Sequence, residues 1–101
     1  KILITTSDDY AILKMIAKEC VSSKKLSPCS HIIDGMVETL YVWDNDLIDV
    51  KEYILIIKCE IKKLNKIKAI INKNHNYDVP EIISINFDIA SEKYRKWFIN
   101  K

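Results

Sequence analysis

Glycine, arginine and long apolar runs are scarce in this chain of 101 residues. The longest apolar run, from Tyr53 to Ile57, is far below the ~20 residues of a membrane span, so we expect no membrane partner. A lone arginine, Arg95, and a net charge of only +2 argue against a nucleic-acid partner. The chain also lacks a glycine-rich phosphate loop and a serine nucleophile motif. We therefore predict no enzyme, no catalytic residues and no organic cofactor.

The cysteines Cys20, Cys29 and Cys59 are an odd number and cannot all pair within one chain. Disulfide frameworks are typical of small secreted domains, so their exclusion predicts reduced thiols and a cytoplasmic protein. Because the sequence begins at Lys1 without methionine, a leader removed before this residue is left open.

Hydrophobic residues make up 49% of the chain and include two Trp and five Tyr, which excludes intrinsic disorder. No repeat or low-complexity linker divides the sequence. Its length is that of one domain, so residues 1–101 are predicted to form a single folded unit.

Hydrophobic periodicity predicts four strands and three helices. Ser7 is the predicted hydroxyl cap of the first helix, with Asp8 and Asp9 at the positive end of its dipole. Asp44-Asn45-Asp46 predicts a turn and Asp34-Gly35 a bulge. The expected elements are a strand over 1–6, a helix ending between 22 and 25, strands over 30–43 and 50–59, a helix over 61–71, a loop over 72–80, a strand over 83–89 and a last helix capped by Ser91.

This order of elements is the split βαβ pattern of the α+β ferredoxin-like fold, an antiparallel sheet with helices on one face. The two middle strands form a long hairpin of about twelve residues a strand, or ~40 Å, whereas a compact chain of this size is only ~33 Å across. The hairpin is therefore expected to project beyond its own domain. Its exposed edge, with Val37, Leu40 and Val42, would aggregate unless it is paired, which predicts oligomerisation through strands.

Several segments resemble, in the same order, the CutA divalent-cation tolerance family. The strongest, His75 to Ile83, is similar to the family's His-Pro-Tyr-Glu-Val-Pro-Glu-Ile, with Asn76 for the first Pro and Asp78 for the first Glu. The resemblance implies a homotrimer of ferredoxin-like protomers with strand pairing between subunits, linked to copper and other divalent metals. The other matches are Tyr41 and Trp43 (Tyr-x-Trp), a strand ending at Lys58, Tyr94 and Trp97 (Tyr-x-x-Trp), and a diverged Leu-Ala-Ala-Cys-Val-Asn-Ile at 26–32.

Three positions depart from the family pattern. Asp44-Asn45-Asp46 replaces the glycine that usually follows the tryptophan, so we expect a different hairpin tip. His31 stands where the family has Asn, and Cys59 stands where it has Thr.

The candidate metal ligands are Cys29, His31 and His75. Cys29 and His31 are two residues apart on a predicted strand, so both side chains can lie on one face. Thiolate and imidazole suit copper or zinc. The alternative is that Cys29 is a small buried hydrophobe and His31 a hydrogen-bonded surface residue.

The second candidate site is a polar cleft between subunits, for a small anion or a metal, built around His75, Tyr77, Glu81 and Lys58. Tyr41, Trp43 and Trp97 are its predicted aromatic wall. In the alternative interpretation the aromatic residues only pack, His75 caps the preceding helix and Lys58 pairs with Glu81.

These features predict a trimeric copper and divalent-metal tolerance protein that binds metal ions weakly and whose partner is itself. The alternative is a trimeric regulatory module that binds a small anionic metabolite between subunits, like the similarly assembled PII signal transducers. A Cys29–His75 dyad is the catalytic alternative, and no spacing requires it.

Overall fold

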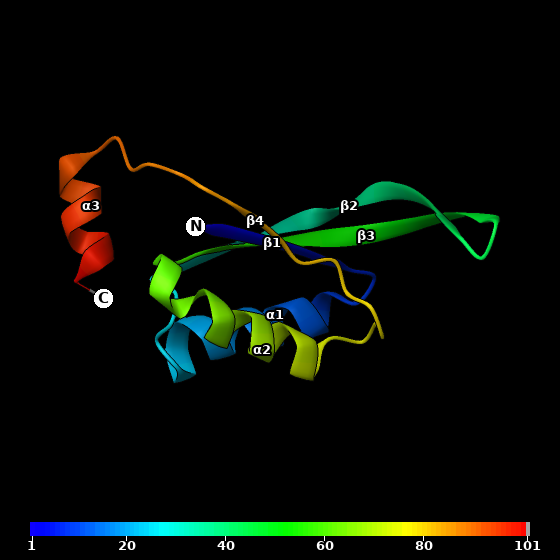
Figure 1. Cartoon of the computed structure of the whole chain (residues 1–101), viewed down its shortest axis with the longest axis horizontal. Helices are drawn as coiled ribbons and strands as arrows, with labels where there is room; N and C mark the ends of the chain where they lie inside the picture. The colour runs from blue at the N-terminus through cyan, green and yellow to red at the C-terminus, as the bar shows by residue number, and fades with distance from the viewer. Residues whose placement is uncertain (101) are drawn as a thin grey trace.

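The computed structural model describes residues 1–100, which form one four-stranded antiparallel sheet with two helices on one face (Figure 1). The strands are β1 (Ile2–Ser7), β2 (Cys29–Trp43), β3 (Asp46–Lys58) and β4 (Ile83–Ile85). The helices are α1 (Tyr10–Lys18), α2 (Leu64–Asn74) and α3 (Glu92–Ile99), with a π-helical turn η1 (Glu19–Ser23) after α1 and a 3-10 turn η2 (Ile61–Lys63) before α2. The strand order β2-β3-β1-β4 confirms the predicted ferredoxin-like fold.

The hydrophobic core lies between the sheet and the helices α1 and α2. Alternate residues of β1 and β3 point toward these helices and are fully buried, as Leu3 and Leu55 illustrate. Within residues 1–100, no helix has both the length and the apolar composition needed to cross a membrane. The core residues are Leu3, Leu13, Ile16, Cys20, Leu26, Leu55, Ile57, Cys59, Ile67, Ile70 and Ile71.

All three cysteines are free, in agreement with the predicted reduced thiols. Cys20 and Cys59 belong to the core and are 0% and 1% exposed. Burial raises the pKa of the Cys20 thiol to about 12 and also raises the pKa of Cys59. Both are therefore inert hydrophobic residues at neutral pH, which leaves Cys29 as the accessible thiol.

The N-cap of α1 is Asp9, and the prediction that Ser7 caps this helix is wrong. The Asp9 side chain accepts a hydrogen bond from the Ala11 N–H at 3.0 Å. Ser7 is instead the last residue of β1, and its hydroxyl accepts from the Asp9 N–H at 3.0 Å. The strand extends through Ser7 because its side chain is fully buried on the core face, two residues beyond Thr5.

The strands β2 and β3 form the projecting hairpin that the sequence predicts (Figure 1). Asp44 and Asn45 make its turn with φ values of 51° and 67°, the left-handed conformation that a type I′ turn has at both central positions. Because this turn is so short, β3 begins at Asp46 rather than at the predicted Val50. The register shifts between Ile33 and Val37, which confirms the bulge around Gly35. The molecule is 47 Å along its longest axis.

The last strand is shorter than predicted. The alternating pattern over residues 83–89 predicts one continuous strand, but β4 ends at Ile85. In the register with β1, Ile85 lies opposite Ile2, the first residue of β1, so residues after Ile85 extend past the end of that strand. Residues 86–90 continue as an extended segment toward α3, without a strand partner among residues 1–100 (Figure 1).

The face of the sheet opposite the helices carries an uncovered apolar patch, which we call the open face. Strand alternation places its residues there, because their neighbours along each strand point into the core. Its outer members Ile33, Ile83 and Ile85 are 44%, 46% and 48% exposed. The open face consists of Ile4, Ile33, Ile54, Ile56, Ile83 and Ile85.

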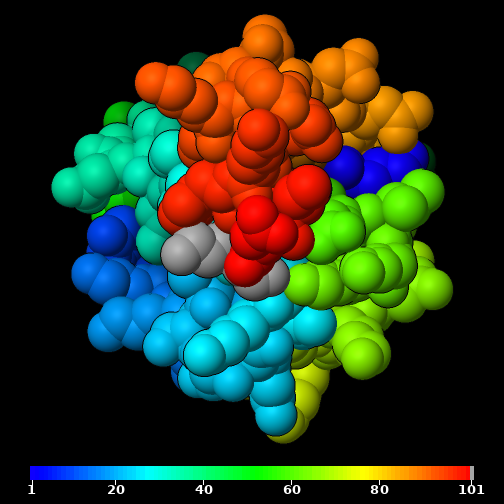
Figure 2. Space-filling view, turned by 90° about the vertical axis from the view of Figure 1, so that its left-hand side faces the viewer, coloured from blue at the N-terminus to red at the C-terminus, as the bar shows by residue number. Residues whose placement is uncertain are grey.

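Helix α3 lies at the end of the molecule remote from the hairpin tip (Figure 1), and it covers the middle of that end face (Figure 2). Ser91 caps it, as predicted, and accepts a hydrogen bond from the Tyr94 N–H. Phe98 is 3% exposed and lies edge-on against Phe87, with ring centroids 6.0 Å apart. This aromatic contact therefore holds α3 against the extended segment that precedes it.

Replacing Thr5 with valine is expected to stabilise the fold. The Thr5 hydroxyl is fully buried on the core face and has no hydrogen-bond partner among residues 1–100. Valine keeps the shape without the unsatisfied oxygen, so Thr5→Val should raise the free energy of unfolding by about 1 kcal/mol. Urea denaturation measures the change, and Thr39→Val on the hairpin is the control, expected to stay within about 0.5 kcal/mol. A loss of stability in Thr5→Val would contradict the prediction.

Candidate functional site

The loop after α2 is fastened to the end of β1 by side-chain hydrogen bonds. Ser7 Oγ donates to Asn76 Oδ1 at 2.6 Å, and Asn76 Nδ2 donates to Asp8 Oδ1 at 2.8 Å. The Asp8 N–H donates to the Tyr77 hydroxyl at 3.0 Å. Asn76, which stands where the family motif has proline, supplies two of these bonds through its side chain. The loop is therefore held rigidly against the sheet.

His75 positions Tyr77 and has no free nitrogen. Its Nε2 lies 2.8 Å from the Thr6 carbonyl oxygen, and its Nδ1 lies 3.0 Å from the Tyr77 N–H. Because a carbonyl oxygen can only accept, Nε2 carries the proton and Nδ1 accepts from Tyr77. Both nitrogens of the neutral ring are engaged, so within one chain His75 offers no lone pair to a metal.

A buried carboxylate lies at the end of this hydrogen-bonded chain. The Tyr77 hydroxyl donates to Glu52 Oε2 at 2.7 Å, and Glu52 is only 3% exposed. Burial, and then the neighbouring Glu52 carboxylate, raise the pKa of the Tyr77 hydroxyl. Tyr77 therefore remains a protonated donor at neutral pH and satisfies one oxygen of the buried carboxylate.

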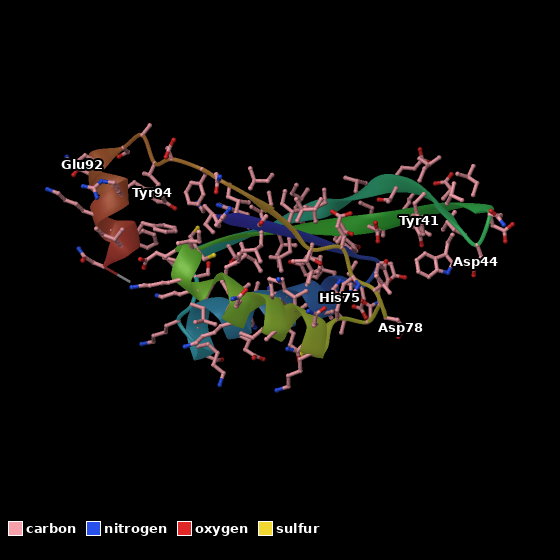
Figure 3. All side chains as sticks on the ribbon, viewed as in Figure 1. Tyr41, Asp44, His75, Asp78, Glu92 and Tyr94 are labelled. Carbon is pink, nitrogen blue, oxygen red and sulfur yellow. The ribbon has the colours of Figure 1, made fainter. Side chains whose placement is uncertain are left out.

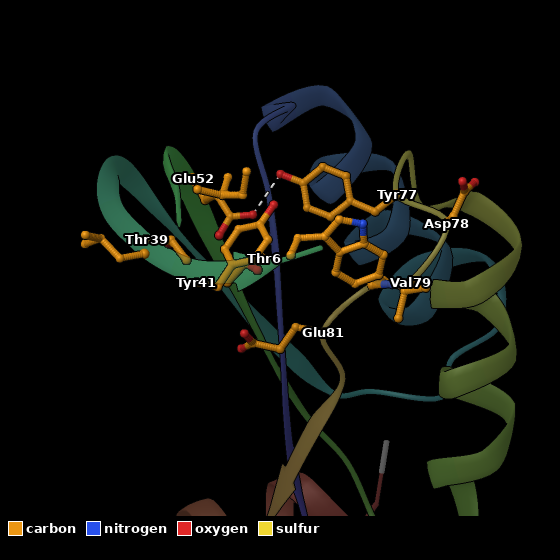
Figure 4. A pocket seen from close by; sticks show the side chains of 12 residues that line it. Thr6, Thr39, Tyr41, Glu52, Tyr77, Asp78, Val79 and Glu81 are labelled. Carbon is orange, nitrogen blue, oxygen red and sulfur yellow. Dashed lines mark hydrogen bonds between the residues drawn. The ribbon is translucent and has the colours of Figure 1, made fainter. Parts of the chain in front are cut away.

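A pocket of about 540 Å³, which we call the hairpin pocket, lies between the projecting hairpin and the loop after α2 (Figure 4). Thr39, Tyr41 and Trp43 of β2 lie on the same face of the hairpin, because side chains on one face of a strand are two residues apart. The loop contributes the opposite wall from Tyr77 to Glu81. The lining residues are Thr6, Thr39, Leu40, Tyr41, Trp43, Ile48, Glu52, Tyr77, Asp78, Val79, Pro80 and Glu81.

A second group of polar side chains, the thiol cluster, consists of Cys29, His31, Lys58 and Tyr94. Cys29 Sγ lies 3.6 Å from His31 Nε2, so the two side chains meet as their spacing predicts. Lys58 lies opposite Cys29 on β3 and donates from Nζ to the Tyr94 hydroxyl at 2.7 Å. This hydrogen bond, and more weakly the Cys29 thiol, raise the pKa of the Lys58 ammonium group. The cluster lies where α3 meets the sheet.

The structure divides the predicted ligand cleft between the two ends of the molecule, which Figure 3 shows by the separation of Tyr41 and Tyr94. Tyr41, Trp43, Tyr77 and Glu81 line the hairpin pocket, with His75 just behind it. Lys58 and Trp97 do not join them. Lys58 is bonded to Tyr94 on α3, and the Trp97 ring stacks on Tyr94 with centroids 5.5 Å apart.

The pairing of Lys58 with Glu81, and the Cys29–His75 dyad, are not formed within one chain. Glu52, at the hairpin pocket, and Lys58 are both on β3, and the intervening positions span ~20 Å at 3.3 Å a residue. Cys29 lies opposite Lys58, whereas His75 bonds Thr6, which lies opposite Ile54. Among residues 1–100, no three His, Cys, Asp or Glu side chains are grouped to hold a metal ion.

Glu52 is the functional candidate that sequence reasoning missed. The sequence does contain a signal for it. Lys51 and Glu52 are adjacent on a strand, so their side chains point to opposite faces of the sheet. Alternation places Glu52 on the same face as Ile54 and Ile56, where a lone carboxylate needs a partner. Its partner, Tyr77, could not be identified from a local pattern.

Comparison with known proteins agrees with the fold of the chain. The family model for the CutA1 divalent ion tolerance protein matches residues 1–101. Protein CutA, chloroplastic, of Arabidopsis thaliana is 36% identical over 87 residues, which are 86% of this chain and 47% of that protein. The chain therefore spans about half the length of the plant relative that it matches.

A shorter relative and a solved structure match over most of both chains. The divalent-cation tolerance protein CutA of Thermococcus kodakarensis is 29% identical over 95% of this chain and 89% of its own. The CutA1 structure from Shewanella superimposes with a TM-score of 0.90 at 30% identity, covering 98% of this chain and 91% of the other. These names describe tolerance of divalent cations and no reaction. The chain belongs to the CutA1 divalent ion tolerance protein family.

Proposed function

We propose that this protein acts in divalent-metal tolerance as a homotrimer that binds copper weakly through Cys29 and His31. The observation that carries the metal site is the 3.6 Å approach of Cys29 Sγ to His31 Nε2 on the surface of the sheet. A thiolate and an imidazole are ligands that copper and zinc share. Two protein ligands leave the coordination sphere incomplete, so water or a second subunit supplies the rest and binding is weak.

His31 is the residue that distinguishes this site from the family motif, in which the corresponding position is Asn. His75 is no longer a candidate ligand within one chain, because its two nitrogens already have partners. Lys58 lies opposite Cys29 on β3, and its side chain is held by the hydrogen bond to the Tyr94 hydroxyl.

Three features support the trimer. The hairpin extends far beyond the helices, the open face leaves an apolar patch in water, and β2 is a long unpaired edge of the sheet. The extended segment 86–90 offers an unpaired backbone of its own. Pairing such a segment with the β2 edge of a neighbour would satisfy both, and closed cyclic symmetry would repeat the contact in every subunit.

Replacing Cys29 with serine is expected to weaken Cu²⁺ binding at least tenfold, about 1.4 kcal/mol, because a soft ligand is lost. His31→Asn, which introduces the family residue, should weaken it as well. Titration calorimetry measures the affinities, and Zn²⁺ gives a parallel titration without redox chemistry. Cys59→Ala is the control, because this buried thiol cannot reach a metal. Unchanged copper affinity in Cys29→Ser would leave Cys29 with a packing role only.

The anionic metabolite of the alternative interpretation gains no support from the hairpin pocket. Glu52, Asp78 and Glu81 line it, and no lysine or arginine among residues 1–100 does so. An anion would be repelled there. The cytoplasmic location remains a prediction, since the Arabidopsis relative is named chloroplastic.

A further inference from the structure

The hairpin pocket contains the predicted Glu81 of the ligand cleft but not its predicted lysine. Lys58 was its expected cation, and this side chain is bonded to Tyr94 at the far end of β3. The described lining contains three carboxylates and three aromatic rings, those of Tyr41, Trp43 and Tyr77. A volume of about 540 Å³ is within the range of pockets that hold small organic molecules.

Glu52 is the group that most needs a positive partner. It is 3% exposed, and Tyr77 satisfies one of its oxygens, Oε2. Within residues 1–100, no lysine, arginine or histidine forms an ion pair with it. A buried carboxylate is costly unless it is paired or fully hydrogen-bonded, so an ammonium group next to Oε1 would stabilise it.

The aromatic rings of the pocket suit the same kind of ligand. In a single chain, Tyr41 and Trp43 are 44% and 56% exposed, although such rings are usually buried. In Figure 4, Tyr41, Tyr77 and Glu81 lie around the same space as Glu52. The face of an aromatic ring attracts an organic cation, most strongly for tryptophan. An inorganic divalent ion would gain little from these rings, and the carboxylates do not converge into a metal site.

We propose that the hairpin pocket binds a small organic ammonium ion, with its cationic group between Glu52 and the rings of Tyr41 and Trp43. Glu81 and Asp78 add negative charge at the loop side of the pocket. This site is separate from the thiol cluster and goes beyond the proposed metal function. A lysine of a second copy of the chain carries the same chemical group, and the test below distinguishes it from a free ligand.

The probe is choline, and 3,3-dimethylbutan-1-ol is its neutral isostere, with carbon in place of the charged nitrogen. In nitrogen-15 NMR spectra of the full chain, the indole N–H signal of Trp43 should shift saturably with choline. The Trp97 signal, at the other end of the molecule, should not move, and Trp97→Phe assigns the two signals. The isostere is expected to bind at least tenfold more weakly, a difference of about 1.4 kcal/mol.

Two variants and a matched control localise the effect. Trp43→Leu should weaken choline binding at least tenfold, and Glu81→Gln should weaken it about threefold, as expected for an exposed charge. In these variants, the backbone N–H signal of Tyr41 or of another hairpin residue reports choline binding. Glu38→Gln removes a carboxylate from the opposite face of the hairpin, next to Lys51, and should change nothing.

Equal binding of choline and its isostere, or equal weakening by Glu38→Gln and Glu81→Gln, would overturn the proposal. So would the absence of any Trp43 shift up to about 100 mM choline, far above a millimolar dissociation constant. Light scattering on the same samples reports the assembly state. An assembled protein without a choline response would mean that a neighbouring subunit fills the pocket, whereas a choline response in a monomer would reject only the trimer.

Discussion

Replacing Ile56 with lysine is expected to convert the proposed trimer of about 35 kDa, three chains of 11.8 kDa, into monomers. Ile56 lies in the middle of the open face, opposite Ile4 on β1 and His31 on β2. Covering this face with a second subunit would bury the new ammonium group among isoleucines, at a cost of several kcal/mol. Light scattering after gel filtration measures the mass at micromolar protein concentration.

Ile61→Lys is the matched control. Ile61 is 69% exposed on the 3-10 turn before α2, away from the open face, so the same substitution there should leave the mass unchanged. The assembly also predicts that the unfolding midpoint of the unmodified chain rises with protein concentration, and that this dependence disappears in Ile56→Lys. A mass of one chain for the unmodified protein, or of three chains for Ile56→Lys, would contradict the prediction.

Replacing Tyr77 with phenylalanine is expected to lower the free energy of unfolding by about 2 to 3 kcal/mol. The substitution removes one hydroxyl that donates to Glu52 Oε2 and accepts from the Asp8 N–H. The buried Glu52 carboxylate then loses a charge-assisted hydrogen bond, and water reaches it poorly because it is 3% exposed. Urea denaturation of the variant and of the unmodified chain measures the loss.

Tyr10→Phe is the control for the loss of a tyrosine hydroxyl. Tyr10 contacts Tyr53 edge-on through its ring, at 5.3 Å between centroids, so this contact remains and the change should stay within about 0.5 kcal/mol. Adding Glu52→Gln to Tyr77→Phe should recover part of the loss, because a neutral amide is less costly to bury than a carboxylate. A Tyr77→Phe variant as stable as the unmodified chain would disprove a stabilising role for this hydrogen bond.

The same variant should alter the alkaline limit of stability. Burial and Glu52 raise the pKa of Tyr77 in the folded chain, whereas an unfolded tyrosine ionises near pH 10. The contribution of Tyr77 is therefore fully present below about pH 10 and is lost as the pH rises toward the folded-state pKa, because the unfolded chain releases the proton first. Between about pH 9 and 11, the stability of Tyr77→Phe should fall less steeply than that of the unmodified chain.

The sequence alone determined the features that depend on neighbouring residues. Alternation and helical periodicity predicted the order of the elements, and the Ser91 cap and the Asp44-Asn45 turn lie where expected, because such signals act over a few residues. The proximity of Cys29 to His31 follows from the two-residue period of a strand. The order of the elements also predicted the ferredoxin-like topology, which the sheet order confirms.

Only the tertiary structure decided which distant residues meet. The bonds from Ser7 to Asn76 and from Glu52 to Tyr77 join residues 69 and 25 positions apart, and no local pattern encodes these partners. The alternation over residues 83–89 predicted a longer strand than the structure contains. The length of a strand depends on its partner, and the pairing of β4 with β1 ends where Ile85 lies opposite Ile2. Lys58 was assigned to the cleft because it ends a strand. However, the two ends of β3 are ~40 Å apart, and Lys58 lies at the end remote from the hairpin tip. Strand register therefore places Lys58 opposite Cys29, where its side chain donates to Tyr94. The charged residues that line the hairpin pocket are carboxylates.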